Sequence, residues 1–294
     1  MGHGVAEFEV SSNTGGDSWG VSGQKRSLTT GSGDCNDNSE SSESSDGRSV
    51  PSAEAGKKRA RNSTSVVGRA LLYPTLEELG LPLPPDVETA QQTAVFHKTG
   101  FLTAKRTNLF IRRFVGLGLQ PYTNNSDIDY NRTGDWIHVT HYLQEGDAFR
   151  TSFSELRAAV LALAREANST NKWGLDLTDP SFRCAEYHHY RPGGCLPEPE
   201  HYDKGSMVTV DVMLQEAESG GEFQTLEVDG VLHKHSFKVG DAIVFLSHKY
   251  HCVSPVVKGE RRVLVCEIWS GEERTCGHRC ELLQGECDFD PNES

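Results

Sequence analysis

A histidine and an aspartate stand two residues apart in the segment PEPEHYDKGS, residues 197–206, where a proline-rich turn leads into His201 and Asp203. Side chains alternate between the two faces of a strand, so this spacing puts the imidazole and the carboxylate on one face. A third candidate ligand, His251, follows in the predicted strand YHCVSPV. Two histidines and one carboxylate on one face of a metal match non-haem Fe(II) sites, which keep other positions open. We therefore predict a metal site rather than a solvated loop.

An arginine follows the last of these ligands at a useful distance. Arg261 lies ten residues after His251, across a turn that runs from Pro255 to Gly259. A guanidinium at such a position can hold a carboxylate through two parallel hydrogen bonds. Arg262 points to the opposite face of the same predicted strand, and the spacing from His251 favours Arg261.

Five short motifs occur in order along this part of the chain. They are YRPGG (190–194), HYD (201–203), GGEF (220–223), GDAIVF (240–245) and HCVSPVVKGER (251–261). In this order they resemble the catalytic core of the 2-oxoglutarate- and Fe(II)-dependent dioxygenases, in particular the prolyl 4-hydroxylase-like branch. The resemblance covers roughly residues 180–270 and leaves out the helical region and the tail before it.

The resemblance implies a role for each matching residue. His201, Asp203 and His251 would bind Fe(2+), and Arg261 would pair with the distal carboxylate of 2-oxoglutarate. Tyr190 would reach the region of the metal and the cosubstrate. The implied reaction uses O2 to decarboxylate 2-oxoglutarate to succinate and CO2 and to hydroxylate a C–H bond, with ascorbate as the reductant.

The chain also departs from the family pattern. Met213 stands where some members place a tyrosine that bonds the distal carboxylate, so we expect Thr209 to take that part as a further cosubstrate-binding residue. Glu267 falls in the same alternation as Arg261, and a carboxylate inside the fold would need a partner.

Four further residues are candidate contacts of a substrate pocket. Arg183, Glu186 and His188 belong to the predicted strand FRCAEYHHY, and Trp269 ends the last predicted strand. Each has an ordinary structural alternative, since a buried histidine is often a satisfied part of the fold and a terminal tryptophan is often core.

A second cluster of metal-ligand types lies near the C-terminus, in CGHRCELLQGEC. Cys276, His278, Cys280 and Cys287 can bind zinc through three thiolates and one imidazole. The spacing matches no zinc module that we can identify. Reduced packing cysteines and a redox-sensitive pair therefore remain alternatives.

Helices are predicted in the first half of the folded part and strands in the second. The helices are expected over 75–81, 84–100, 104–119 and 152–169, with an extra strand in DWIHVTHYL, 135–143. Strands are expected over 182–190, 207–214, 221–228, 231–237, 241–247, 250–256 and 261–269, with a two-residue hairpin at VDGV. This pattern predicts an α+β fold with a mainly β core. With the resemblance, that core is a double-stranded β-helix (jelly roll) with supporting N-terminal helices.

The composition divides the chain further. Residues 1–65 are rich in Ser, Gly, Asn and Asp, which predicts a disordered tail. The basic cluster KKRAR at 57–61 is either a nuclear import signal or a run of charges that no receptor recognises. A helical support region (66–180), the β-helix core (181–271) and a Cys-rich extension (272–294) are expected to follow.

The charge and the hydropathy limit the partners. The formal net charge of -13 argues against nucleic acid as a partner, and no stretch is long and apolar enough for a membrane span. Because no signal-peptide pattern is visible, we expect a cytoplasmic or nuclear protein whose cysteines are thiols or metal ligands.

Three functions fit these observations. The first is hydroxylation of an amino-acid side chain in a peptide or protein, which the prolyl-type motifs favour. The second keeps the fold but acts on a small molecule or nucleobase. The third is a non-catalytic metal-binding or sensing module, which the intact set of ligands and Arg261 argue against.

Overall fold

The computed structural model describes residues 74–118 and 128–287. The expected tail, its basic cluster and the end of the C-terminal extension lie outside the described residues. The described part contains a seven-stranded antiparallel sheet with the order β1-β10-β6-β13-β4-β3-β2 and a four-stranded sheet with the order β5-β11-β8-β9. Two short strands, β12 and β7, pair separately. None of the described helices is long and apolar enough to cross a bilayer.

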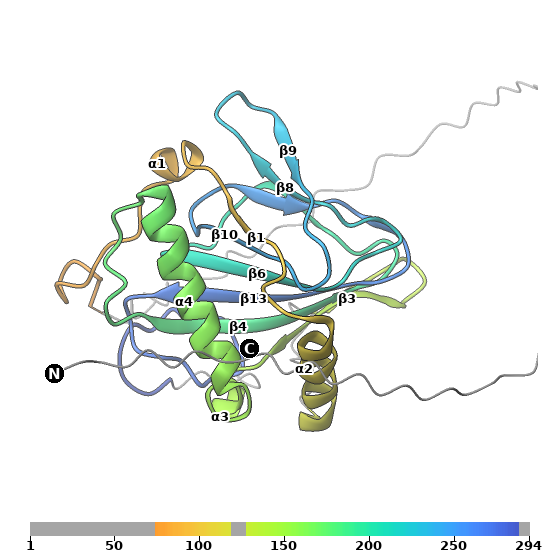
Figure 1. Ribbon diagram of the computed structural model, residues 1–294, viewed down its shortest axis with the longest axis horizontal. Helices are drawn as coiled ribbons and strands as arrows, with labels where there is room; N and C mark the ends of the chain where they lie inside the picture. The colour runs from red at the N-terminus through yellow and green to blue at the C-terminus, as the bar shows by residue number, and fades with distance from the viewer. Residues whose placement is uncertain (1–73, 119–127, 288–294) are drawn as a thin grey trace, which may run out of the picture. The chain divides into compact units, whose positions relative to one another are not determined.

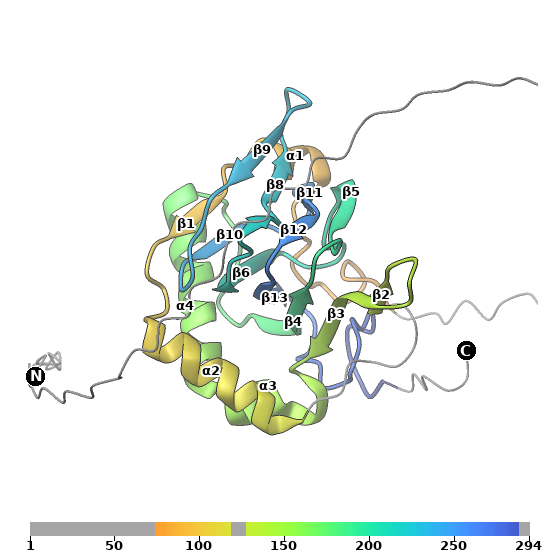
Figure 2. The same cartoon turned by 90° about the vertical axis from the view of Figure 1, so that its right-hand side faces the viewer.

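The strands from β4 onward alternate between the two sheets. The large sheet receives β4 (Ser181–Tyr190), β6 (Val208–Gln215), β10 (Ala242–Leu246) and β13 (Arg261–Trp269). The small sheet receives β5 (Leu196–His201), β8 (Phe223–Leu226), β9 (Leu232–His235) and β11 (His251–Val253). Figure 2 shows the two sets of strands facing each other. This alternation makes the core a double-stranded β-helix, so the predicted fold class is confirmed.

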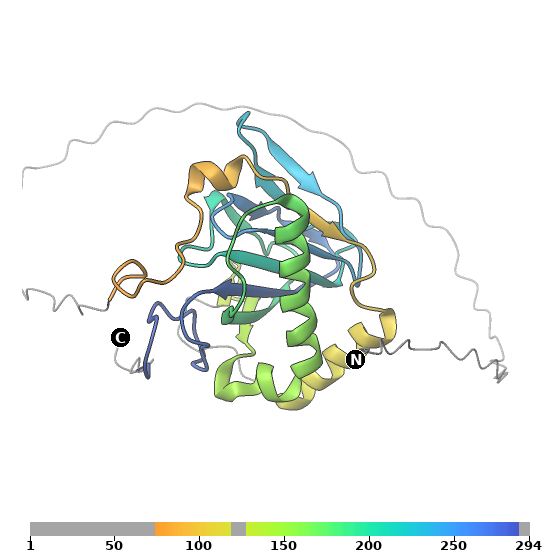
Figure 3. The ribbon, with the colours of Figure 1, turned by 60° about the vertical axis from the view of Figure 1, so that its left-hand side comes forward.

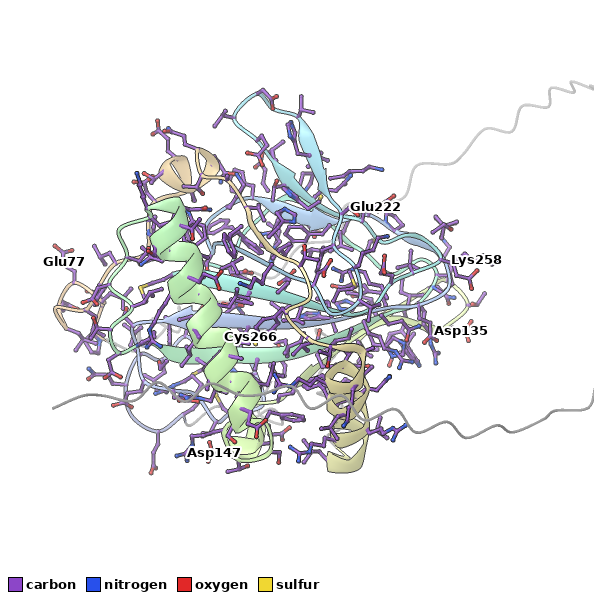
Figure 4. All side chains as sticks on the ribbon, viewed as in Figure 1. Glu77, Asp135, Asp147, Glu222, Lys258 and Cys266 are labelled. Carbon is purple, nitrogen blue, oxygen red and sulfur yellow. The ribbon has the colours of Figure 1, made fainter. Side chains whose placement is uncertain are left out.

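Helices cover the outer face of the large sheet. The helices α2 (Ala104–Leu117) and α4 (Ser154–Asn171) contribute Phe110, Phe114 and Val160 to a core that includes Val210 and Cys266 of the sheet. Figure 3 shows α4 running across the strands, and Figure 4 labels Cys266 beneath it. The other face of the same strands looks into the space between the sheets, which is where polar groups of β6 and β13 gather.

Two of the predicted N-terminal helices are much shorter than expected. Thr75 and Glu78 form a capping box, but the chain makes only one turn because Gly80 adopts a φ of 63°. Helix α1 covers only Val87–Gln91, and β1 (Phe96–Lys98) pairs instead with β10 and becomes the edge strand of the large sheet. Edge pairing thus overrides the helical pattern over 92–100.

The range 66–180 is therefore not purely helical, since β2 (Ile128–Tyr130) and β3 (Trp136–Tyr142) also extend the large sheet. The extra strand expected over 135–143 is confirmed. The predicted helix over 152–169 is α4, preceded by the short helices η1 (Glu145–Asp147) and α3 (Ala148–Ser152). The N-cap residue of α4 is Phe153, and it makes no side-chain capping hydrogen bond.

The strands predicted over 182–190, 207–214 and 261–269 are present to within one residue, and the other strands of the β core are present but shorter. The strand expected over 250–256 is split into β11 and β12 (Val256–Lys258), and β12 pairs with β7 (Ser219–Gly220). The expected two-residue hairpin is a longer turn. The Glu227 carbonyl accepts from the Gly230 N–H at 2.9 Å, and the Glu227 N–H donates to Val231 at 3.0 Å. Gly230 has a φ of 75°, which a type I turn followed by a bulge requires.

A glycine pair bends the chain between β7 and β8. Gly220 and Gly221 have φ angles of 74° and 68°, a region that other residues rarely adopt. A Cβ atom on Gly220 would lie 2.2 Å from the carbonyl oxygen of Pro255. The GGEF motif therefore lies where the backbone at Gly220 closely approaches that at Pro255. The side chain of Phe223, at the end of the motif, is buried in the interior.

Candidate active site

The candidate metal ligands come from the small sheet and the loop that leaves it. His201 ends β5 and is paired directly with His251 at the start of β11. Asp203 lies just past the end of β5, where its N–H donates to the carbonyl of Ser247 at 2.8 Å. One ligand atom from each of the three residues falls within 4.8 Å of the others. Tyr202, between the two ligands of the HYD motif, packs its ring against His248 and Tyr250 instead.

The distances within the triad suit one metal ion. The Asp203 Oδ1 atom lies 3.4 Å from His201 Nε2 and 3.8 Å from His251 Nε2. Metal bonds of about 2.0–2.2 Å to nitrogen and oxygen set ligand atoms roughly 3 Å apart, so only a small contraction is needed. The mixed set of imidazole and carboxylate, with open positions, fits Fe(II).

Hydrogen bonds behind the ligands hold them in position. The carbonyl of Lys249 can only accept, so the Nδ1–H of His251 donates to it at 2.9 Å and leaves Nε2 for a metal. The Lys249 ammonium, fully buried, donates to the Gln91 carbonyl and to Glu227 at 3.1 and 2.8 Å. Helix α1 and the β8–β9 hairpin therefore brace the strand that carries His251.

The charge state of the triad favours a cation. Burial would raise the pKa of Asp203, but the charge of His251, the hydrogen bond with His201 and the charge of Arg279 outweigh it and hold that pKa below its usual value. Burial lowers the pKa of His251. The triad thus offers an ionised carboxylate and a neutral imidazole, the protonation states that metal ligands need.

Thr209 lies beside the triad and not beside Arg261. Its hydroxyl donates to Asp203 Oδ2 at 2.6 Å and also contacts Ser247 at 2.9 Å. Thr209 is opposite Glu267, six residues along β13 from Arg261, which corresponds to about 20 Å of strand. The expectation that Thr209 bonds the distal carboxylate is therefore corrected, because its hydroxyl is taken up by a predicted metal ligand.

Arg261 is a buried cation without a hydrogen-bond partner. It is 1% exposed, and none of its three guanidinium nitrogens is bonded by any described residue. Its guanidinium lies 5.3 Å from the ring centre of Tyr190, and His138 stacks on that ring at 4.1 Å. Burial lowers the pKa of Arg261. A buried unpaired charge costs several kcal/mol, so this site calls for an anionic ligand.

A cavity of about 220 Å³ opens at the Arg261 end of the barrel. Pockets for drug-sized ligands hold about 300–1,000 Å³, so this volume suits a smaller molecule. Phe223 lines the cavity, and its ring also lies 5.6 Å from that of His251. The triad itself is not part of the lining, so Phe223 marks the boundary between the cavity and the metal end. Apolar and small residues of the lining include Met213, Ala217, Gly221 and Phe237. Its charged residues are Arg261, Lys234, Glu216 and Glu222.

Asp211 is a buried carboxyl of β6 that sequence reasoning missed, although an acid inside the apolar run VTVDVML was a visible signal. It is 4% exposed, and its Oδ1 atom has no hydrogen-bond partner. Burial, only partly offset by the charge of Arg261, raises its pKa to about 8. At neutral pH Asp211 is therefore mostly protonated and leaves the positive charge of Arg261 uncompensated.

This gives a pH prediction. Between its ordinary pKa of 3.8 and about 8, Asp211 binds more protons in the folded than in the unfolded chain. The free energy of unfolding should therefore fall as the pH rises through this window. We expect Asp211→Asn to flatten this fall between about pH 5 and about pH 8 in urea denaturation of the apoprotein. Asp229→Asn, at an exposed carboxyl, is the control. If the free energy of unfolding changed with pH equally in wild type and in Asp211→Asn, the raised pKa of Asp211 would be contradicted.

The candidate substrate contacts fall into two groups. Glu186 and His188 face the barrel interior and bond each other at 2.8 Å. His188 continues to His138 at 3.0 Å, and His138 to Asp129 at 2.9 Å, which forms a polar chain across β2, β3 and β4. The rings of His138 and His188 lie next to Tyr190. Glu186 is buried and His188 is partly exposed, and both stay candidates.

Arg183 and Trp269 lie instead under the C-terminal segment, which we define as residues 272–287. Arg183 donates to the carbonyls of Cys280 and Lys204, and the indole N–H of Trp269 donates to the Glu272 carbonyl. Arg183 is 4% exposed and Trp269 is 1% exposed. Their contacts are those of packing residues. Trp269 is a core residue, as its structural alternative predicts.

Glu267 faces the interior, as its alternation predicts, and it has the partners that it needs. Ser206 donates to it at 2.5 Å, and the guanidinium of Arg183 lies 3.7 Å away. The Nε atom of Arg279 lies 2.8 Å from a carboxylate oxygen of Glu267, but the two are not aligned as a hydrogen bond. A terminal nitrogen of Arg279 lies 3.2 Å from Asp203. Sequence reasoning missed Arg279, whose signal is its place between two predicted zinc ligands.

Comparisons with known proteins give likenesses of fold only. No family model matches the chain, and no curated protein matches it. A prolyl-4-hydroxylase of Pseudomonas putida is 22% identical, with 64% of this chain and 97% of that chain covered and a TM-score of 0.45. A prolyl hydroxylase of Trichoplax adhaerens, solved with a peptide of hypoxia inducible factor, is 13% identical over 63% and 87% of the chains, with a TM-score of 0.44.

A third solved structure is HygX of Streptomyces hygroscopicus, with nickel and 2-oxoglutarate bound. It is 11% identical over 68% of this chain and 93% of that chain, with a TM-score of 0.46. The resemblance seen in the motifs is thus found again among solved structures.

Proposed function

We propose that the protein is a 2-oxoglutarate- and Fe(II)-dependent dioxygenase that hydroxylates an amino-acid side chain in a peptide or protein, with succinate and CO2 as coproducts. The observation that carries the proposal is the buried guanidinium of Arg261. It has no hydrogen-bond partner among the described residues, it lines a small cavity, and it lies inside the same barrel as a triad of two histidines and one carboxylate. A metal chelator with a second carboxylate would supply the anion that Arg261 lacks.

Each residue then has a defined part. His201, Asp203 and His251 would hold iron, which supplies the activation of O2 and the oxidation of the substrate. Arg261 would bind the distal carboxylate with two parallel hydrogen bonds, and Tyr190 would support the guanidinium from one side. Thr209 orients the Asp203 carboxylate. The apolar rings of Phe223 and Phe245, which lie 5.6 and 4.9 Å from the His251 ring, exclude water behind the metal.

The shape of the barrel mouth supports a large substrate. The His201 side chain is 31% exposed, so the triad is open to solvent on one side. The β8–β9 hairpin extends past the triad, because Thr225 is in register with His251 and the turn lies three or more residues further on, about 10 Å along the strand. Figure 1 shows this hairpin projecting from the sheets. Val228, Val231 and Leu232 near its tip are exposed and can contact a chain that extends beyond the cavity.

The test is succinate formation by the purified full chain with Fe(II), ascorbate and 2-oxoglutarate, in the presence of peptide pools. We expect peptides that act as substrates to raise succinate formation and to gain one oxygen atom in mass spectrometry. His201→Ala is the inactive control. Pools of nucleosides and of small metabolites are tested in parallel at the same concentrations.

Each outcome bears on one part of the proposal. Succinate that is coupled only to nucleosides or small metabolites would keep the oxygenase and overturn the peptide substrate. No succinate above the His201→Ala control with any pool, in protein that still binds Fe(II) and 2-oxoglutarate, would favour the non-catalytic module.

A further inference from the structure

The C-terminal segment is held on the barrel without secondary structure and without a core of its own. Residues 272–287 form no helix or strand. Its two leucines, Leu282 and Leu283, are only partly buried, and Cys280 is its one buried apolar residue. Structureless segments beyond about 12–15 residues are uncommon in compact domains. Burial of apolar surface therefore does not account for the ordered path of this segment.

Four side chains of this segment meet at one point. Cys276, His278, Cys280 and Cys287 each place a ligand atom within 4.8 Å of the others. The Nε2 atom of His278 lies 3.1 Å from Cys287 Sγ, and the sulfurs of Cys280 and Cys287 are 3.7 Å apart. In a tetrahedral zinc site with bonds of about 2.3 Å to sulfur and about 2.0 Å to nitrogen, ligand atoms lie roughly 3.5–3.8 Å apart.

The side chain between His278 and Cys280 points away from the cluster. Cys276, His278 and Cys280 are two apart, and the side chain between the last two, Arg279, contacts Asp203 and Glu267. The backbone around the cluster is also fixed, because Gln144 donates to the carbonyls of Cys276 and His278 at 3.2 and 3.1 Å. The four ligands are therefore presented by a braced segment.

We propose that Cys276, His278, Cys280 and Cys287 form a structural zinc site that fixes the C-terminal segment against the barrel. Three thiolates and one imidazole, with all four positions filled by protein, are the donor set and the closed geometry of structural zinc. A cluster of several irons does not fit, because donor atoms within 4.8 Å of one another enclose one ion. Binding releases protons from the thiols as the metal replaces them. The site does not depend on the proposed dioxygenase activity.

The zinc site would also reach the candidate active site. Arg279 connects the segment to the Asp203 carboxylate, and Arg183 connects the Cys280 carbonyl to the interior of the large sheet. Loss of zinc should therefore loosen the segment and increase hydrogen exchange both in residues 272–287 and next to Arg183 in β4.

The first experiment is metal analysis of the untagged full chain, expressed with zinc in the medium. The triad can also take up zinc, so the reference protein is the double variant His201→Ala, Asp203→Ala. We expect this variant to retain one zinc per chain, and the further change Cys280→Ser or Cys287→Ser to remove it. Cys195→Ser is the matched control, because Cys195 is a half-buried thiol outside the cluster, and it should keep the zinc.

Cobalt tells the two metal sites apart. Co(II) bound to thiolates gives charge-transfer absorption in the near ultraviolet, which a site of two histidines and one carboxylate does not give. We expect this absorption in wild type and in the triad variant, and its loss in Cys287→Ser. Modification of the thiols in wild type should release one zinc, which keeps the test valid if a serine variant fails to fold.

Three results would overturn the proposal. They are a triad variant that contains no zinc, a disulfide between Cys280 and Cys287 in freshly purified protein, and Co(II) binding without thiolate absorption. Succinate formation is measured in a separate assay. Failure of the zinc site is therefore distinguishable from failure of the proposed function.

Discussion

Replacement of Arg261 by methionine should abolish turnover of 2-oxoglutarate and leave the fold intact. The guanidinium has no hydrogen-bond partner among the described residues, so its removal breaks no described hydrogen bond and removes a buried charge. We therefore expect the free energy of unfolding of the apoprotein to be unchanged or higher. Binding of 2-oxoglutarate loses a buried charge pair, which is worth about 2–5 kcal/mol, or about 30- to 5,000-fold.

The measurements are calorimetric affinity for 2-oxoglutarate, succinate formation and urea denaturation. Arg262→Met is the matched control, because Arg262 follows on the same strand but bonds Glu260 at 2.8 Å on the other face. The control should keep its affinity for 2-oxoglutarate. Unchanged affinity in Arg261→Met, or a large loss of stability in that variant, would show that the guanidinium has a structural partner and not a ligand.

Replacement of His201 by alanine should remove tight binding of Fe(II). His201 is the most exposed of the triad residues, at 31% of its side chain, so the substitution leaves little buried cavity and should cost little stability. Changes in residues that merely support metal ligands typically cost 10–100-fold in affinity, and loss of a ligand should cost more than about 100-fold. Succinate formation should fall at least as far.

Equilibrium dialysis against Fe(II) or Mn(II) measures the affinity, and added imidazole should restore part of the activity by occupying the place of the lost ring. His233→Ala is the control, because His233 lies on β9 with 52% of its side chain exposed and outside the triad. The metal assignment would be wrong if His201→Ala bound iron as wild type does, or if His233→Ala lost iron to the same degree.

Both predictions depend on the polar lining of one barrel. Thr209, Asp211 and Glu267 belong to strands whose opposite face is apolar and packed under α4. Buried polar groups at these positions cost stability unless they are paired. Thr209 and Glu267 are paired, whereas Asp211 and Arg261 keep atoms without partners, and those two lie where a ligand is proposed to bind.

The β core could be predicted well because its information is local. Alternating apolar residues in 207–214 and 261–269 predict strands, and the strands are found there as β6 and β13. The region before β4 was predicted less well. The pattern over 84–100 is helical by propensity, but Phe96 pairs with Val244 in the edge of the large sheet, a contact between segments far apart in the chain. Such pairing energy is not contained in a local window.

The residues of the candidate site divide in the same way. The HYD spacing and the ten residues from His251 to Arg261 were visible in the sequence, because ligands on strands follow the alternation of side chains. The partner of Thr209 was not visible, because the register of β6 against β13 decides that it lies opposite Glu267 and six residues from Arg261. The same holds for Arg183 and Trp269, which the C-terminal segment covers.

The sequence by itself determined which chemistry is available and on which face of each strand it stands. Residue type and spacing are properties of neighbouring residues, and they sufficed to identify the two ligands around Tyr202 in HYD, although Asp203 lies just past the end of β5. The tertiary structure decided which of these groups are paired and which are left without partners. Asp203 is satisfied by Thr209 and Arg279, and Arg261 by no described residue. Only the register and packing of distant segments make that difference, and it is the reason to place a dicarboxylate at Arg261.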